Sequence, residues 1–211
     1  MFYSEMSSYK LLYFDMRGMG EVIRLLFALA DVPYEDQRLS REEWELLKPE
    51  TLFGQLPILV VDGKMLPQSY AIYRYLSNEF GYAGKSAYER ALVDSIADAQ
   101  KDVFQHLLAY FMAKAGNSQG DPELIFEERV KPAIDTHFPL LVQRLKESGS
   151  GFFAESGITW VDLVVSEQLS TFRNFKPDAL ARYPELEQHI ETVHSVPQIQ
   201  KWHSIKPPSQ Y

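Results

Sequence analysis

The sequence predicts an α/β domain followed by an all-α domain, and three observations support this prediction. Up to about residue 80, short apolar runs typical of strands alternate with runs of helical period. After the stretch 81–86, which we expect to be a linker, apolar residues recur at helical spacing almost to the end. The chain has 211 residues, of which 45% are hydrophobic, so two modest domains could each bury a core.

The first part of the chain predicts a β-α-β unit. Residues 9–14 are rich in aromatic and branched side chains and predict a strand, which ends where Gly18 and Gly20 permit a sharp turn. Residues 21–31 have apolar positions at helical spacing and are followed by a proline, so they predict a helix. Residues 34–39 predict a second strand.

A β-β-α unit follows. Residues 57–61 have the pattern of a short buried strand, Asp62-Gly63 is a favoured hairpin dipeptide, and 64–66 form a second short run. Ser69 can cap the next helix, whose apolar positions extend to about Phe80. The predicted order of the first domain is therefore β-α-β and then β-β-α.

The second half of the chain predicts helices only. The segments with helical period are 87–115, 122–147, 159–172 and a further helix that starts at Pro184. Pro132 and Pro139 are expected to kink or split the second segment, because proline cannot donate a backbone hydrogen bond inside a helix. Thr159 and Asp162 stand at the N-cap and N3 positions of a capping box. From Ile205 onward the chain is expected to be an irregular tail.

Composition and charge argue against several classes of function. The formal net charge of −8 disfavours an extended basic surface for nucleic acid. No stretch approaches the ~18 apolar residues of a membrane-spanning helix, and the first residues lack the order of a signal peptide, so we expect a cytoplasmic protein. The chain has no cysteine, which excludes disulfides and cysteine nucleophiles. None of the five histidines forms the i, i+4 pair of a helical zinc site, and we expect no metal.

Several motifs in the first hundred residues occur together in one register. They are Tyr-Lys-Leu-Leu-Tyr-Phe-Asp-Met-Arg-Gly at 9–18, Glu21, Arg24, Trp44, Lys48, Phe-Gly-Gln-Leu-Pro at 53–57, Gln68-Ser69 and Asp102. With this set the chain resembles the sigma-class glutathione transferases, especially the helminth enzymes, and the vertebrate haematopoietic prostaglandin D synthase. The resemblance runs from Tyr9 to at least Asp102 and continues more loosely to the end.

This resemblance implies a particular architecture. A thioredoxin-like glutathione-binding domain would cover 9–83, after an extension of residues 1–8, and an all-helical bundle would cover 84–211. The chain would associate as a homodimer. Related families that use a cysteine nucleophile carry it at the end of the first strand, where this chain has Tyr13.

The resemblance implies that Tyr13 activates the thiol of glutathione. A free thiol has a pKa near ~8.5, whereas the nucleophile is its thiolate. The neutral Tyr13 phenol would donate a hydrogen bond to the thiolate sulfur, and the positive charge of Arg17 would reinforce this stabilisation. Considered alone, Tyr13 would be a strand aromatic in the core, but its place in the whole motif favours the catalytic role.

The resemblance also implies which groups hold the glycyl and cysteinyl parts of glutathione. Trp44 and Lys48, at i and i+4, would offer an indole N–H and an ammonium to the glycyl carboxylate. The Leu56–Pro57 peptide bond is expected to be cis, so that the Leu56 backbone can pair with the cysteinyl part. Gln55 would add a side-chain amide nearby.

The γ-glutamyl end would be bound by three further residues. Gln68 and Ser69 would hold its carboxylate where a helix begins, because free N–H groups there favour an anion. Asp102 would reach the ammonium group from the partner subunit. Considered alone, Ser69 would be a simple N-cap and Asp102 a solvated carboxylate.

The pocket for the second substrate is expected between the two domains. Its candidate residues are Phe14, Met19, His106, Tyr110 and Met112. Aromatic and methionine side chains at helical spacing are also common in cores.

The predicted function is conjugation of reduced glutathione to small hydrophobic electrophiles, which would serve detoxification. Glutathione would be a substrate, and no cofactor is expected. Two alternatives stay open. One is isomerisation of an endoperoxide in the manner of prostaglandin D synthase, and the other is non-catalytic binding of haem or other apolar ligands.

Overall fold

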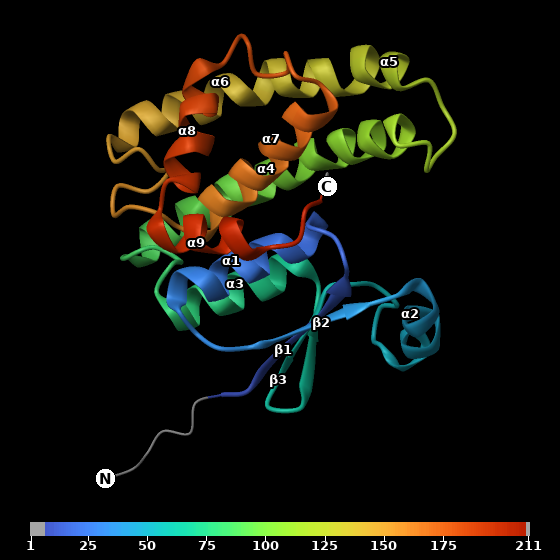
Figure 1. The fold of residues 1–211 in the computed structure, drawn as a ribbon. Helices are drawn as coiled ribbons and strands as arrows, with labels where there is room; N and C mark the ends of the chain where they lie inside the picture. Colours follow the sequence, from blue (N-terminus) through green and yellow to red (C-terminus); the bar gives the residue numbers. More distant parts are fainter. Residues whose placement is uncertain (1–6, 210–211) are drawn as a thin grey trace. The chain divides into compact units, whose positions relative to one another are not determined.

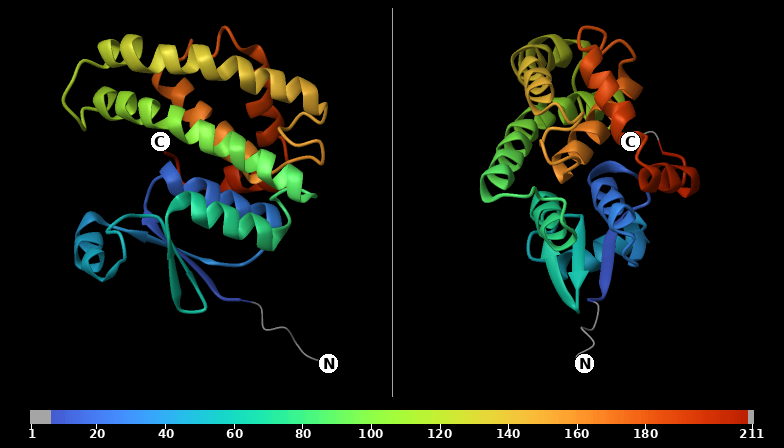
Figure 2. Two further views of the ribbon diagram at one scale, coloured as in Figure 1. Left: turned by 180° about the vertical axis from the view of Figure 1, so that it is seen from behind. Right: turned by 90° about the vertical axis from the view of Figure 1, so that its left-hand side faces the viewer.

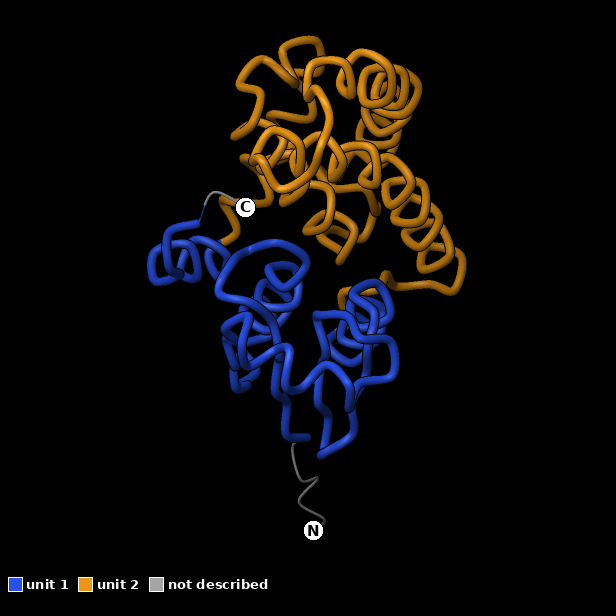
Figure 3. Tube along the Cα trace, turned by 90° about the vertical axis from the view of Figure 1, so that its right-hand side faces the viewer, with its two compact units in different colours: residues 1–80, 197–211 blue, residues 81–196 orange. Residues whose placement is uncertain are grey.

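The computed structural model describes residues 7–209, which fall into two compact units. One unit runs to Phe80 and takes in the segment from Pro197 onward, whereas the other spans Gly81–Val196 (Figure 3). The extension predicted at 1–8 lies outside the described residues except for its last two positions.

Helix α9 (Pro197–Ile205) accounts for the difference between these units and the predicted domain boundaries. The resemblance implies one domain over 84–211, and no separate helix is predicted here. In the structure α9 packs against α1 (Glu21–Ala30), as Figure 1 shows, and the indole N–H of Trp202 donates to Glu21 Oε1 at 2.8 Å. A bond between residues so far apart in the chain leaves no local pattern in the sequence.

The first unit contains a four-stranded sheet with the order β2-β1-β3-β4. Its strands are β1 (Tyr9–Phe14), β2 (Glu35–Leu39), β3 (Ile58–Val61) and β4 (Lys64–Pro67). Strands β1 and β2 are parallel, whereas β3 is antiparallel to both β1 and β4. The predicted β-α-β and β-β-α order is confirmed. At the hairpin Asp62 and Gly63 both have positive φ, at 49° and 80°, as a tight two-residue turn requires.

Three helices accompany this sheet. Besides α1 they are α2 (Arg41–Leu47) and α3 (Ser69–Phe80), and short 3₁₀ helices lie at Gly18–Gly20 and Lys48–Glu50. Figure 1 shows α1 and α3 side by side along the sheet, with α2 apart from them near the end of β2.

Strand alternation divides the β1 side chains between the two faces of the sheet. Leu12 belongs to a buried cluster with Leu39, Ile58 and Trp44 of α2, and Phe14 packs against the same cluster. Tyr13, between Leu12 and Phe14, therefore points to the opposite face.

The second unit is all-helical, as predicted. It contains α4 (Ala87–Lys114), α5 (Pro122–Ile125), a π-helical segment (Phe126–Val130), α6 (Lys131–Ser148), α7 (Trp160–Phe175) and α8 (Pro184–His194). Helix α7 is buried along most of its length and packs against α4 and α8. Figure 2 shows α4 and α6 running side by side as the two long helices of this unit.

The prolines of the second segment act differently. The π-helical turn ends immediately before α6, and Pro132 stands in the first turn of α6, where its missing N–H is not needed. The chain stays helical from Pro122 to Ser148, so the predicted split does not occur, and the segment instead changes its hydrogen-bond pattern just before Pro132. Pro139 lies inside α6, which continues to Ser148 without ending there.

The predicted capping box at the start of α7 is confirmed. The Thr159 backbone N–H and hydroxyl donate to Asp162 Oδ2 at 2.7 and 2.8 Å. The Phe153 N–H donates to Asp162 Oδ1 at 2.9 Å, so this fully buried carboxylate also ties down the preceding loop. Both residues have a structural role. In the chain from 7 to 209, no helix combines the length and apolar character needed to cross a bilayer.

Candidate active site

Tyr13 stands one residue before the end of β1 and is only 6% exposed. After the strand the chain turns through 15–17, and the 3₁₀ helix Gly18–Gly20 brings the backbone back over the tyrosine ring. The Met19 N–H donates to the Tyr13 hydroxyl oxygen at 2.9 Å. A hydroxyl that accepts one hydrogen bond still has its own proton to donate.

Two glycines make this close approach possible. A Cβ atom on Gly18 would lie 2.5 Å from Tyr13 Oη, and one on Gly20 would lie 2.5 Å from Tyr13 Cδ1. Gly18 also has a φ of +39°, a conformation that residues other than glycine rarely adopt. The sequence predicts a turn at these glycines but gives no sign of their contact with Tyr13.

Tyr13 is held in its neutral form by its surroundings. Burial raises the pKa of the phenol above its usual 10.0, and the Met19 N–H and the charge of Arg24 oppose this effect without cancelling it. The Arg24 guanidinium carbon lies 5.8 Å from the centre of the Tyr13 ring. At neutral pH Tyr13 is therefore suited to donate a hydrogen bond and unsuited to act as a base.

Arg24 fixes the loop that follows β1. Its guanidinium, only 1% exposed, donates to the Met16 carbonyl at 2.7 Å and the Phe14 carbonyl at 3.4 Å. It also pairs with Asp36 of β2 at 3.0 Å and with Glu21 at 3.3 Å. One buried cation thus joins the ends of two strands to the first turn of α1.

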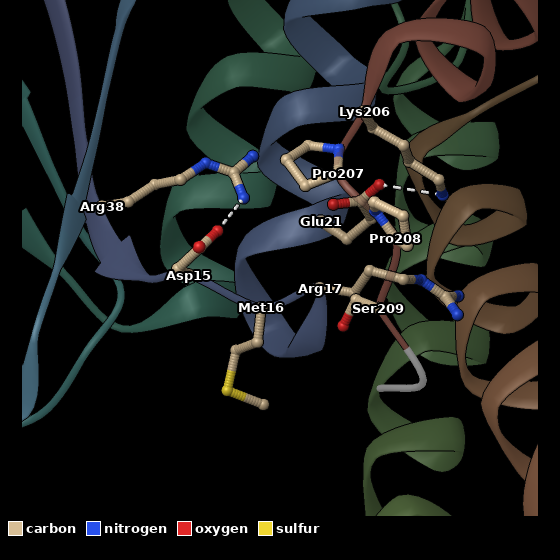
Figure 4. A pocket seen from close by; sticks show the side chains of 9 residues that line it. All are labelled: Asp15, Met16, Arg17, Glu21, Arg38, Lys206, Pro207, Pro208 and Ser209. Carbon is tan, nitrogen blue, oxygen red and sulfur yellow. Dashed lines mark hydrogen bonds and ion pairs between the residues drawn. The ribbon is translucent and has the colours of Figure 1, made fainter.

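Arg17, the predicted partner of Tyr13 in catalysis, is 9% exposed. It lines a pocket of about 40 Å³ together with Glu21, Arg38 and the segment from Lys206 to Ser209. In Figure 4 its guanidinium points away from Asp15 and Arg38. The cation that the structure places against the Tyr13 ring is Arg24, which the sequence analysis notes only as part of a motif.

Trp44 and Lys48 are one helical turn apart, as predicted. Helix α2 begins with a capping box in which Ser40 Oγ accepts the Glu43 N–H at 3.1 Å and Glu43 accepts the Ser40 N–H at 2.7 Å. At the other end of α2 the Lys48 N–H donates to the Trp44 carbonyl.

The donor groups of these two side chains are available for a ligand. Trp44 packs in the cluster under β1 and is 7% exposed, whereas Lys48 is exposed and its aliphatic part runs along Gly54. Within residues 7–209 neither the Trp44 indole N–H nor the Lys48 ammonium has a hydrogen-bond or ion-pair partner.

The residues before β3 and before α3 come together. The Leu56–Pro57 bond is cis, as expected. The Gln68 side-chain amide donates to Gln55 Oε1 at 2.9 Å, which joins two of the predicted ligand-binding residues.

Helix α3 begins at Ser69 itself, one residue before the predicted start, since the sequence predicts Ser69 as the N-cap. Ser69 is its first residue, and the carbonyl of Gln68 accepts the Ile72 N–H, so Gln68 stands in the capping position. Gln68 has a φ of +74°, a backbone conformation that few residues other than glycine adopt.

Phe14 connects two parts of this site. Its ring centre lies 5.9 Å from that of Tyr13 and 6.5 Å from that of Trp44. Met19 contributes both of its backbone polar groups: its N–H donates to the Tyr13 hydroxyl, and its carbonyl accepts the Tyr73 hydroxyl at 2.6 Å. Tyr73 is not among the site residues predicted from the sequence. A tyrosine on the apolar face of a predicted helix looks the same in the sequence as an ordinary core residue.

The remaining predicted residues lie on α4 of the second unit. Asp102, His106 and Met112 are exposed. Tyr110 is 1% exposed and packs in an aromatic cluster with Phe111, Phe126 and Phe172, so the structure gives it a place in the core of this unit.

Comparison with known families identifies two matching domains. Residues 9–78 match the glutathione S-transferase N-terminal domain, and residues 101–205 match the glutathione S-transferase C-terminal domain. Glutathione S-transferase 1 of Ascaris suum is 47% identical over 98% of this chain and 100% of its own length. Probable glutathione S-transferase 8 of Caenorhabditis elegans is 42% identical over the same shares of the two chains.

Solved structures agree. The glutathione S-transferase from Ascaris lumbricoides superimposes with a TM-score of 0.93 at 47% identity, covering 97% of this chain and 100% of that one. Na-GST-3 of the hookworm Necator americanus, described as monomeric, gives 0.91 at 42% identity over the same shares. Rat hPGDS complexed with a quinoline gives 0.85 at 33% identity, again over 97% and 100%. The predicted fold class, a thioredoxin-like domain and a helical domain, is confirmed.

Gly20→Ala should displace the Tyr13 ring, because the new methyl group would overlap Cδ1. We expect a loss of about 1–3 kcal/mol in the free energy of unfolding, the usual cost of overpacking. Urea denaturation measures this loss. In a Tyr13→Ala background the same substitution should cost much less, and an equal cost in both backgrounds would contradict the steric account.

Proposed function

Since the chain belongs to the glutathione S-transferase family, we propose that it conjugates reduced glutathione to small hydrophobic electrophiles and that Tyr13 stabilises the attacking thiolate. Family membership makes the protein a glutathione transferase. The observation that supports the role of Tyr13 is its neutral, buried hydroxyl, which accepts the Met19 N–H and keeps its own proton for a ligand.

The proposed reaction is a nucleophilic substitution by sulfur. The thiol of bound glutathione loses its proton to solvent, and the Tyr13 hydroxyl donates a hydrogen bond to the resulting thiolate. The sulfur lone pair then forms a bond to the electrophilic carbon, and the leaving group departs with its electron pair. The positive charge of Arg24 beside the ring strengthens the Tyr13 donor, and Arg17 adds to the positive potential of the loop.

Glutathione carries two carboxylates and an ammonium, and the first unit offers matching groups for its anionic ends. The Trp44 indole N–H and the Lys48 ammonium would bind the glycyl carboxylate. Ser69 and the free N–H groups of the first turn of α3 would bind the γ-glutamyl carboxylate, with Gln68 and Gln55 beside them. The Leu56 backbone would pair with the cysteinyl part.

Conjugation of this kind makes apolar electrophiles water-soluble, so we propose detoxification as the role of the enzyme. A cytoplasmic location fits that role, because reduced glutathione is abundant there.

We also propose a homodimer in which Asp102 completes the glutathione site of the partner subunit. Asp102 is exposed on α4 of a single chain, which is compatible with a role across an interface. The relative Na-GST-3 is described as monomeric, so the family resemblance alone leaves the assembly to be tested.

Tyr13→Phe should fold and bind glutathione but conjugate it slowly, because only the hydroxyl donor is lost. Without that charge-assisted bond, worth about 1.5–3 kcal/mol, the midpoint of thiolate formation should rise by about one to two pH units. Ultraviolet absorbance of the bound thiolate against pH gives the midpoint, and a chromogenic aryl halide gives the rate. An unchanged midpoint and rate would assign the stabilisation of the thiolate to another group.

Trp44→Phe and Lys48→Ala should each weaken glutathione binding by about ten- to a hundredfold, the cost of a lost charge-assisted bond. The phenylalanine keeps the ring that packs under β1, so the fold should survive. Isothermal titration calorimetry measures the affinity, and Lys64→Ala, which removes an exposed lysine of β4, is the control. Equal affinity in all three variants would place the glycyl carboxylate elsewhere.

A mixture of two variants of low activity tests the trans role of Asp102. If Asp102 serves the partner's site, a mixed dimer of Asp102→Ala and Tyr13→Phe chains contains one intact site, so mixing should restore part of the activity. If Asp102 acts within its own chain, every site in the mixture is damaged. Light scattering gives the mass, and full activity at the 24.3 kDa of one chain would contradict the dimer.

A further inference from the structure

Two tyrosine hydroxyls hold Met19 from opposite sides. The Met19 N–H donates to Tyr13 at 2.9 Å, and the Met19 carbonyl accepts the hydroxyl of Tyr73 at 2.6 Å. Tyr73 lies on α3 and is 1% exposed. Both contacts fall within the first unit.

We propose that Tyr73 is a positioning residue that directs the Tyr13 hydroxyl toward the glutathione sulfur by fixing Met19. This inference rests on the proposed role of Tyr13 as the donor to the thiolate.

The direction of the Tyr13 proton depends on the place of the Met19 N–H. A phenolic proton lies near the plane of its ring, where it can point to either side of the oxygen. A donor on one side occupies that position, so the proton of Tyr13 must point to the other. If Met19 moves, the proton gains a second direction and the hydrogen bond to sulfur is weakened.

Tyr73 is one of the groups that anchor the segment around Met19. Gly18 and Gly20 flank it, and neither has a side chain that could hold the backbone in place. Arg24 fixes the earlier part of the loop through the carbonyls of Phe14 and Met16. The Glu21 N–H donates to the carbonyls of Arg17 and Gly18, which joins this segment to α1, and the Tyr73 hydroxyl adds an attachment to α3 through the Met19 carbonyl.

Helix α3 links this anchor to the binding site. Tyr73 follows Ser69 by four residues, about one helical turn, so both lie on the same face of α3 in its N-terminal part. Ser69 would bind the γ-glutamyl carboxylate of the same glutathione molecule whose sulfur faces Tyr13. One rigid helix therefore sets both the place of the substrate and the orientation of the donor.

Tyr73→Phe tests the proposal, because it removes the hydroxyl and keeps the buried ring. We expect turnover to fall on the order of two- to tenfold, the range for a lost neutral hydrogen bond, and the midpoint of thiolate formation to rise. The KM for glutathione should change little. Tyr75→Phe is the matched control, since it removes a hydroxyl from the same helix that interacts with Tyr9 instead of Met19.

The double variant Tyr13→Phe with Tyr73→Phe separates positioning from stability. If Tyr73 acts through the Tyr13 hydroxyl, its substitution should have no further effect on the thiol midpoint once that hydroxyl is gone. Additive shifts would overturn the proposal. A shift in Tyr13→Phe with none in Tyr73→Phe would overturn it and leave the proposed function intact, whereas no shift in either variant would refute the role of Tyr13 itself.

Discussion

The candidate site depends on the hydrogen bonds and ion pairs of the buried Arg24 guanidinium. A charge with so little exposure must be fully paired, because an isolated cation in the interior is strongly unfavourable. Arg24 meets this requirement with the carboxylates of Glu21 and Asp36 and the carbonyls of Phe14 and Met16. These partners belong to both parallel strands, the loop between β1 and α1, and α1 itself. The first part of the loop after β1, at Phe14 and Met16, therefore cannot move without breaking the pairing of a buried charge.

The same network reaches the end of the described chain. Glu21 is 2% exposed and accepts hydrogen bonds from Trp202 and Lys206, which attaches the last helix to the first unit. These contacts affect function by fixing the loop next to Tyr13. Arg24 fixes the early part of the loop, Tyr73 fixes the later part, and the neutral Tyr13 hydroxyl is left with its proton available. The chemistry of the thiol thus rests on several contacts that never touch the substrate.

Much of the first unit could be predicted from local patterns, because alternation and turn chemistry act over a few residues. The strand over 9–14 and the hairpin at Asp62-Gly63 are examples. Helix α9 could not be predicted, since it is stabilised by distant Glu21. Tyr13 was identifiable only through the whole motif, and its partner, the Met19 N–H, is a backbone group that any residue could supply. The burial of Tyr110 among Phe111, Phe126 and Phe172 could not be predicted either, because helical spacing alone does not show which aromatic side chains are enclosed by other helices.

In the proposed site the Tyr13 hydroxyl donates to the sulfur of glutathione while it accepts the Met19 N–H. A crystal structure of the protein with bound glutathione tests this most directly. We expect the sulfur to lie within hydrogen-bonding distance of Tyr13 Oη, on the side of the oxygen away from Met19, with the Met19 contact retained. A sulfur that is bound out of reach of Tyr13, or a Tyr13 ring that has turned away from Met19 to meet it, would contradict the account.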